Sequence, residues 1–342
     1  MKKFYSAAKY LFLLGIGIFI LWLVFKGVDP DAIADGFAHA NYIWVAIALS
    51  AGMLSHVSRT LRWNMLIAPL GFRPRFISAF AAIMLGYLAN LALPRMGEVT
   101  RCIVLNRTDN IPVNKLFGTV IVERIIDLIS LLLIVAFTFI MEFDRLKNFL
   151  SEQIGGSVQE KGDSFSTLLS PLNISIVVFV IGAGLFLLYM ILRMKNPPAF
   201  IIKIRSLFEG FVSGLKTIRA MENNWLFILH TVFIWIMYFL MSYLCFFALD
   251  ATDHLDLLAG LSVLAIGSLG FILPVQGGIG TFHWAVREAL AIYDIDKTDG
   301  LVLGTLIHAS QALMIILFGA ICFLIFIYLI KKKAANEVPN LS

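Results

Sequence analysis

Charged side chains interrupt an apolar region at residues 85–101, which read LGYLANLALPRMGEVTR. The apolar run ends at Pro94, and three charged residues follow it closely: Arg95, Glu98 and Arg101. A proline followed by a glycine does not continue a straight helix. Non-helical backbone with charges at membrane depth persists only where protein buries it or where it lines a polar cavity. We therefore predict that this stretch forms the functional site.

Two arginines around one carboxylate favour the binding of an anion. Arg95 and Arg101, together with the N–H groups that a helix break frees, suit a phosphate or a carboxylate, and we include Asn90 among the binding candidates. The alternative is that Glu98 and Arg101, three residues apart, pair on one helical face and neutralise each other near the membrane interface.

A second charged group lies within the next apolar stretch. Glu123 and Asp127 are four residues apart and share a helical face, with Arg124 beside them. A helix that starts near Leu116 would place Glu123 about 10 Å deep, at about 1.5 Å per residue. Charges at that depth are costly unless they are paired or hydrated. The group therefore predicts an ion-pair network, for example with Arg59 or Arg62, or a proton-coupling site, and both readings stay open.

The sequence PVQGGIGT at residues 274–281 resembles the first break but carries no charge. Glycines here allow the backbone to approach a ligand or a neighbouring helix closely, so Gln276, Gly277 and Gly278 are binding candidates with helix packing as the alternative. His283 follows directly, and His308 occupies the position that corresponds to the Glu123 region. A membrane histidine is also a common hydrogen-bonded packing residue.

Composition places the chain among membrane proteins. Its 342 residues are 60% hydrophobic and 14% charged with a mean hydropathy of +0.88, whereas soluble domains carry about 25% charged residues. The net charge of +5 therefore reflects membrane topology and predicts no nucleic-acid partner. We find neither a metal motif nor a nucleotide-binding loop and expect no cofactor. No polar segment is long enough for a soluble catalytic domain.

The apolar pattern predicts an all-α polytopic protein, a single integral membrane domain over residues 1–342. Six spans are expected, at residues 10–25, 42–57 with helix continuing to 66, 116–141, 172–192, 225–249 and 301–330. The segments 76–93 and 257–273 end in proline and glycine, and we interpret them as two re-entrant helical hairpins. Residues 193–224 have the spacing of an interfacial amphipathic helix.

Charge distribution sets the predicted orientation. Most of the 27 Lys and Arg residues fall in segments that this topology assigns to the cytoplasm, which predicts a multi-pass protein of the cytoplasmic (inner) membrane with both termini inside. The two halves, 42–141 and 225–330, then form an inverted-topology repeat joined by residues 172–224. Pro94 matches Pro274, and Gly97 matches Gly277. Transporters with inverted repeats bind substrate near the midplane between broken helices.

At these residues the chain resembles the lysylphosphatidylglycerol synthase transmembrane-region family, also called flippase-like membrane proteins. Four stretches carry the resemblance: RTLRW at 59–63, NLALPRMGEVTR at 90–101, GTVIVERIID at 118–127 and PVQGGIGT at 274–281. The family includes the membrane domain of the multiple peptide resistance factor, which moves an aminoacylated phospholipid between leaflets. The resemblance implies lipid translocation, and Arg59 and Arg62 join the binding candidates. It does not imply synthesis, because we expect no transferase domain in this chain.

These observations together predict a flippase or scramblase-like translocator with a polar cavity between the two hairpins. Arg95 and Arg101 would hold the lipid phosphate, while the carboxylates of Glu98, Glu123 and Asp127 would hold a cationic part of the head group or a coupling proton. Two alternatives stay open, an integral-membrane transferase acting on a lipid-linked substrate and a small-anion transporter.

The expected partner is a membrane phospholipid or a lipid-linked substrate. Small residues at Gly182-Ala183-Gly184 suit helix packing within one chain or between chains, so we also consider a homo-oligomer. A separately encoded lipid-modifying enzyme is a further partner to consider.

Overall fold

The computed structural model describes residues 2–155, 223–272 and 275–337, and every regular element in these ranges is a helix. The chain forms two compact units, Met1–Met141 with Lys216–Ser342, and Glu142–Leu215. The second unit contains α7 (Phe143–Gly155). Arg145 in the first turn of this helix forms an ion pair of 3.5 Å with Glu142, the residue directly before the helix. The predicted span at 172–192 and the predicted amphipathic helix at 193–224 lie outside the described residues.

The first unit begins with three helices, of which the second and third start at a side-chain cap, Asp29 and Asn41. The three helices are α1 (Lys2–Phe25), α2 (Pro30–His39) and α3 (Tyr42–Ile67). The side chain of Asn41 accepts a hydrogen bond from the backbone N–H of Ile43 at 3.1 Å and so starts α3. The helix runs on without a break beyond residue 57 and brings a buried polar face into the fold. The short 3-10 turn η1 (Ala68–Leu70) then ends it.

The segment at 76–93 forms the first of two tightly packed helix pairs. It is α4 (Phe76–Ala92), which is followed by α5 (Gly97–Asp109). A Cβ atom on Gly97 would overlap with the Gly86 carbonyl oxygen, so only glycine at this position lets α4 and α5 approach so closely. The turn between them places Arg95 at φ 62°, a backbone conformation that side chains other than glycine rarely adopt.

The second pair repeats this arrangement with other residues. It consists of α12 (Leu257–Gly270), the 3-10 turn η3 (Gln276–Gly278) and α13 (Thr281–Ala291). Asp256 caps α12 by accepting from the Ala259 N–H at 2.9 Å. A Cβ atom on Gly270 would come within 2.9 Å of the Thr281 carbonyl oxygen, so a glycine again allows two helices to meet. Pro274 lies outside the described residues.

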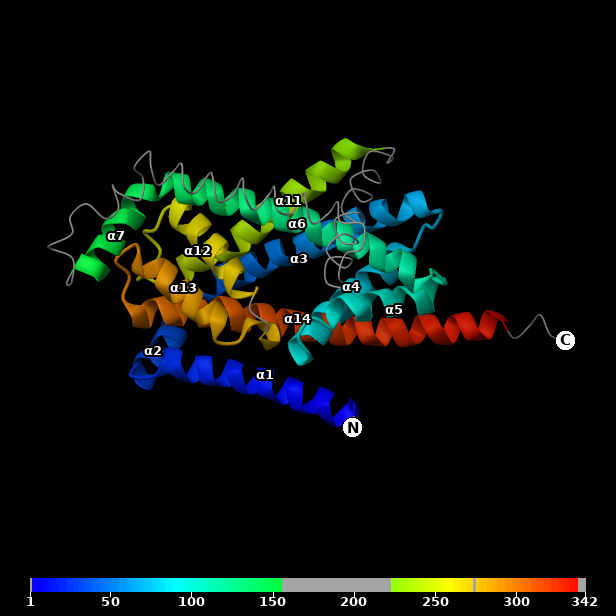
Figure 1. The fold of residues 1–342 in the computed structure, drawn as a ribbon, viewed down its shortest axis with the longest axis horizontal. Coiled ribbons are helices and arrows are strands. Elements are labelled where there is room, and N and C mark those ends of the chain that lie inside the picture. The colour runs from blue at the N-terminus through cyan, green and yellow to red at the C-terminus, as the bar shows by residue number, and fades with distance from the viewer. Residues whose placement is uncertain (1, 156–222, 273–274, 338–342) are drawn as a thin grey trace, which may run out of the picture. The chain divides into compact units, whose positions relative to one another are not determined.

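Four further elements surround the two pairs: α6 (Val113–Met141), α11 (Asn224–Tyr243), η2 (Leu244–Ala248) and α14 (Lys297–Glu337). Helix α11 packs along α3, α6 packs against α5 and α12, and α14 packs against both α4 and α13. Within this unit, the N-terminal end of α1 and the C-terminal end of α14 point away from α2 (Figure 1).

Two separate apolar cores hold the first unit together. One surrounds the α4–α5 pair and includes Trp63, Met84 and Leu105, all fully buried. The other surrounds the α12–α13 pair and includes Phe246 and Leu290. Each helix pair is therefore anchored in its own core.

The helices are apolar enough for a membrane. Among the described residues, Asn224–Ala248 and Lys297–Ala335 each meet the length and hydropathy of a span. Two bent pairs meet it when taken together, Pro30–His39 with Tyr42–Leu70 and Val113–Met141 with Phe143–Phe149. Helices α4 and α12 have 17 and 14 residues and are shorter than the approximately 20 residues that cross a bilayer.

Candidate functional site

A cavity of about 600 Å³ lies between the two helix pairs. Both breaks contribute to its wall, the first through Pro94 and Arg95 and the second through Val275 and Gly277. Helices α3, α6, α11 and α14 complete the lining. Ligand sites in proteins have volumes of about 300 to 1,000 Å³, so this cavity has room for a lipid head group.

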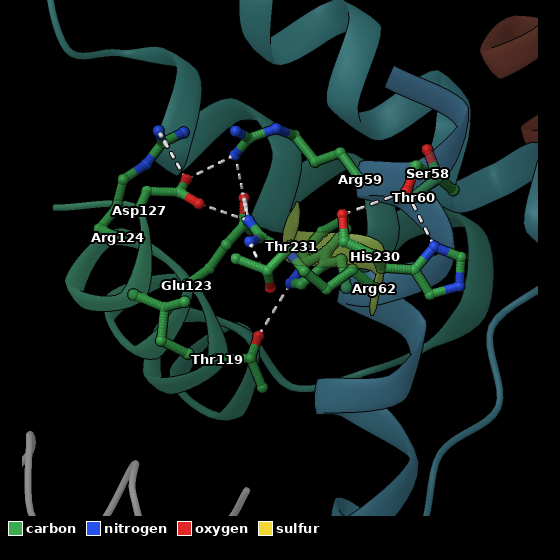
Figure 2. A network of polar contacts seen from close by, with 12 residues as sticks. Ser58, Arg59, Thr60, Arg62, Thr119, Glu123, Arg124, Asp127, His230 and Thr231 are labelled. Atoms are coloured by element: carbon green, nitrogen blue, oxygen red, sulfur yellow. Dashed lines mark hydrogen bonds and ion pairs between the residues drawn. The ribbon is translucent and has the colours of Figure 1, made fainter. Parts of the chain in front are cut away.

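Figure 2 shows an ionic network around Glu123, whose carboxylate is fully buried. Arg59 donates to Glu123, and Arg101 Nη1 donates to Glu123 Oε2 at 3.0 Å. Arg62 Nη2 lies 3.7 Å from the same carboxylate. Three guanidinium groups therefore compensate one buried negative charge, which would otherwise be very costly at this depth.

Asp127, one turn further along α6, continues the network. Its two oxygens accept from Arg59 Nη1 at 2.9 Å and from Arg62 Nη2 at 2.7 Å. The spacing explains the fit: Arg59 and Arg62 are three apart on α3, and the two carboxylates are four apart on α6, so both pairs project from single faces. The indole N–H of Trp63 donates to Thr119 Oγ1 at 2.9 Å and holds the two helices in register.

Neutral side chains from α11 accept further hydrogen bonds from the two buried arginines of α3. Tyr238 accepts from Arg59 Nη2 at 3.0 Å, and Thr231 accepts from Arg62 Nη1 at 3.2 Å. The sequence analysis did not identify either residue. Tyr238 stands in an aromatic-rich span where its hydroxyl carries no distinguishing pattern, and only the packing of α11 against α3 reveals its role.

The rim of the cavity carries a more exposed pair. Arg124 Nε lies 3.2 Å from Glu98 Oε1, and the two side chains are 42% and 25% exposed. The structure thus gives Glu98 and Arg101 different partners, although their spacing on one helix suggested that they pair with each other. Helix α6 crosses α5 closely enough to offer Arg101 the buried carboxylate of Glu123, and burial strengthens that interaction.

Arg95 is the exposed charge of the first break. Its Nη2 atom donates to the carbonyl of Ile272 at 3.4 Å, so its side chain reaches from the first break to the second. Its positive φ costs roughly 1 kcal/mol or more for a residue other than glycine. The guanidinium group is therefore held at the cavity despite an unfavourable backbone conformation.

The second break presents uncharged groups. His308 Nε2 lies 2.7 Å from the Gly277 carbonyl oxygen and donates to it, because a carbonyl only accepts. His283 Nδ1 accepts from the N–H of Gly280 at 3.3 Å and thereby caps α13. Glycines 277, 278 and 280 all have positive φ angles, between 57° and 82°. This turn is built from backbone conformations that only glycine adopts without strain.

The predicted site residues divide into two groups. The cavity lining includes Arg59, Asn90, Arg95, Glu98, Arg124, Asp127, Gly277, Gly278 and His308. Five others are not among the described residues that line it: Arg62, Arg101, Glu123, Gln276 and His283. Arg62, Arg101 and Glu123 lie behind the lining, where they hold the residues that face the cavity.

Sequence reasoning also missed the aromatic residues of the cavity. Tyr87 and Trp235 line it together with Tyr238, and Gln311, one turn from His308 on α14, lines it as well. The buried Nε1 of Trp235 and Nδ1 of His56, another lining residue, have no hydrogen-bond partner within the described part of the chain. Both atoms are fully buried within residues that line the cavity.

Charge in the network is unbalanced. Five arginines, Arg59, Arg62, Arg95, Arg101 and Arg124, face three carboxylates, Glu98, Glu123 and Asp127, and each of these carboxylates is already paired with at least one arginine. The excess of positive charge can attract an anion. Among the residues that the structure describes, no group of three His, Cys, Asp or Glu side chains is placed to hold a metal ion.

Two known proteins are similar to this chain over most of its length. Glycosyltransferase AglD of Haloferax volcanii is 23% identical over 313 residues, which is 85% of this chain and 50% of AglD. The chain therefore matches about half the length of that relative. The UPF0104 membrane protein MJ1078 of Methanocaldococcus jannaschii is 25% identical over 259 residues, 74% of this chain and 98% of that protein. No solved structure gives a significant match.

The family comparison covers nearly the whole chain. The model of the lysylphosphatidylglycerol synthase transmembrane region matches residues 10–319, which include both helix pairs, the ionic network and the cavity. The apolar helices and this match together indicate an integral membrane protein. The chain belongs to the lysylphosphatidylglycerol synthase transmembrane-region family.

Proposed function

We propose that this protein translocates a lipid with an anionic head group between the leaflets of the cytoplasmic membrane. The observation that carries the proposal is the cavity between the two breaks, with its excess of arginine over carboxylate. A phosphate that leaves the interface must exchange its hydration for other donors, and arginine side chains supply strong, directional ones. The family to which the chain belongs supports a role with membrane lipids.

The membrane arrangement that we propose has six spans and two re-entrant hairpins in an inverted repeat, residues 42–141 and 225–330. The lengths of α4 and α12 support it, because helices of 17 and 14 residues that fold back on a partner suit re-entrant segments better than spans. The chain ends of α1 and α14 within the first unit are compatible with both termini in the cytoplasm (Figure 1).

In this proposal the head-group phosphate contacts Arg95, Arg59 and Arg124, with Asn90 as an additional hydrogen-bonding group. Arg62 and Arg101 act indirectly, since they fix Asp127 and Glu123. The backbone of Gly277 and Gly278 allows close approach from the opposite side, and His308 fixes that backbone.

The ion pairs limit which lipid head groups the cavity can bind. An ammonium group on the lipid would have to displace an arginine from Glu98 or Asp127, because both carboxylates are paired. The pairs therefore favour a head group whose remaining part is uncharged and bonds to Trp235, Tyr238 or Gln311. We accordingly propose that the carboxylates hold arginine side chains and do not bind a cationic substrate. A proton-coupling role for Glu123, Arg124, Asp127 and His308 is the alternative proposal for this network.

Two alternatives come from other functional classes. The similarity to the glycosyltransferase AglD, of which this chain matches half, suggests a transferase acting on a lipid-linked substrate. A small-anion transporter would use the same arginine excess. The proposed partners of the translocator are a membrane lipid, a second copy of the chain and a separately encoded lipid-modifying enzyme.

Reconstitution separates these functions. Purified full-length chain in vesicles of phosphatidylcholine with a fluorescent phosphatidylglycerol on one leaflet should change the sidedness of that lipid and leave its mass unchanged. A new lipid mass would instead identify a transferase. Transport of soluble phosphate with no movement of lipid would identify an anion transporter. Absence of lipid movement in both membrane orientations, at an imposed membrane potential and pH gradient, would reject the proposal.

A further inference from the structure

A second pocket, of about 420 Å³, lies where the apolar part of α14 ends in lysines. Three cationic residues line it, Arg75 before α4 and Lys332 and Lys333 on α14, and Asp109 at the end of α5 is its carboxylate. None of these residues lines the cavity between the helix pairs. The pocket is a separate site that the proposed transport does not use.

Contacts between three helix ends hold the pocket together. Lys333 Nζ donates to the carbonyl of Arg107 at 2.9 Å and also to Asn110, and so closes the C-terminal end of α5. Asn110 ends that helix in the left-handed conformation, at φ 58°. A lysine at a helix C-terminus is electrostatically favourable. Lys333 therefore has a defined position, and the end of α14 is fixed against α5.

The remaining cations have weaker partners. Arg75 Nε is 3.5 Å from Asp109 Oδ1, at the limit of a useful hydrogen bond, and its side chain is 54% exposed. Lys332 is exposed and makes no ion pair within the described residues. Three cations against one carboxylate leave an excess of positive charge. The backbone N–H of Arg75, directly before α4, donates to Asp109 Oδ1 at 3.4 Å, so Asp109 already lies at the start of this helix.

The surroundings of the pocket identify the source of the anion. Tyr328 and Leu324, about one and two turns before Lys332, are 61% and 67% exposed on the apolar part of α14. Phe76 and Ile77 are exposed at the start of α4, directly after Arg75. A phosphate in the pocket would therefore lie beside apolar surface on two helices. Basic pockets between helices at the membrane interface are suited to anionic lipid head groups.

We propose that this pocket binds the phosphate of an anionic membrane lipid, which stays with the protein as a structural lipid and is not the transported molecule. Arg75 and Lys332 contact the phosphate, Lys333 and Asp109 position the helix ends, and the acyl chains lie on the exposed side chains of α14 and α4.

Native mass spectrometry of the purified full-length chain tests the site. The pocket double variant Arg75→Gln/Lys332→Gln is compared with Arg73→Gln/Lys331→Gln, which removes the same charge near the same helix ends from residues that do not line the pocket. Each cation at a membrane surface changes lipid affinity about fivefold, so the pocket variant should bind phosphatidylglycerol at one site at least about tenfold more weakly. The control variant should retain that site, and phosphatidylcholine should not occupy it.

Equal loss of phosphatidylglycerol in both double variants would overturn the proposal, because only general surface charge would be involved. Competition by glycerol 3-phosphate as strong as that of the lipid would overturn the assignment to a lipid. The single variant Lys332→Gln repeats the comparison at an exposed position where misfolding is not expected. Failure of this site leaves the transport proposal unaffected, since the two share no residue.

Discussion

The two breaks occupy similar places in the fold but use different chemistry. In the first, the side chain of Asn90 accepts from the Gly97 N–H at 2.6 Å, and arginines surround the turn. In the second, the side chain of His308 donates to the Gly277 carbonyl, and the turn consists of glycines with positive φ. The first break thus presents charged side chains, whereas the second presents a turn of glycine backbone. The two turns therefore offer different contacts to the same cavity.

The largest expected effect on stability is in the network behind the first break. Glu123→Gln removes a buried negative charge from three arginines, and breaking a buried pair costs about 3 to 5 kcal/mol. Thermal unfolding in detergent measures this loss as a lower Tm. The control is Glu288→Gln on α13, beside the second break. This substitution removes a partly exposed ion pair with Arg287 and should lower the stability by less than about 1 kcal/mol. Equal Tm changes would show that the network is not a special feature of the first break.

The glycines of the second break give the next effect. Gly280→Ala should cost about 3 kcal/mol, because Gly280 has φ 82° and a Cβ atom there would lie 2.7 Å from the backbone nitrogen of Leu21 in α1. Gly71→Ala is the control, with φ 85° and open space around the added atom. Because ψ is −50° at Gly280 and 14° at Gly71, the difference in Tm between the two alanine variants reports the close approach of α1 together with this difference in backbone conformation. Equal Tm values would show that the close approach of α1 does not destabilise the Gly280 variant.

A smaller effect is expected at the first helix pair. Gly97→Ala places a Cβ atom against the Gly86 carbonyl oxygen and the Asn90 side chain, and overpacking of this kind costs about 1 to 3 kcal/mol. Gly118→Ala on α6, where nothing lies within 4 Å, should instead raise stability by up to about 1 kcal/mol. Opposite shifts in Tm for these two substitutions support close contact of α4 with α5. A neutral Gly97→Ala variant would contradict it.

The polar contacts that hold each turn should be similar in strength. Asn90→Leu leaves the Gly97 N–H without its acceptor, and His308→Leu leaves the Gly277 carbonyl without its donor, at a cost of about 1 to 3 kcal/mol each. His308→Gln and Asn90→Asp keep a donor and an acceptor and should recover part of the loss in Tm. Recovery at one turn only would show that the two breaks are not held in equivalent ways.

Much of the fold was predictable because helix ends follow local rules. Apolar runs closed by Pro94 or by the glycines near residue 277 place α4 and α12 within a few residues of the predicted segments 76–93 and 257–273. The partners of Arg59 and Arg101 depend instead on how α3, α5 and α6 cross, which no spacing within one helix determines. Arg101 was predicted to hold the lipid phosphate. In the structure it pairs with Glu123 behind the residues that line the cavity.

The side of the cavity formed by α11 was not predictable for a related reason. Trp235 and Tyr238 belong to an apolar span in which aromatic residues commonly face lipid, and their three-residue spacing fits either orientation. Only the long contact of α11 with α3 turns Tyr238 toward Arg59. A polar atom without a partner, such as Nε1 of Trp235, is visible only once tertiary packing is known.

Arg95 offers the most direct test that the first break recognises the anionic head group. Within the described residues its exposed side chain makes one hydrogen bond, of 3.4 Å, and Arg95→Gly also removes a positive φ from a residue other than glycine, so this variant should unfold at or above the wild-type Tm. The measurement is leaflet-resolved transfer of fluorescent phosphatidylglycerol in vesicles by wild type, Arg95→Gly and the control Arg73→Gly. The account predicts transfer reduced at least about tenfold by Arg95→Gly, the equivalent of about 1.4 kcal/mol, and unchanged by Arg73→Gly. Wild-type transfer by a stable Arg95→Gly protein would contradict it.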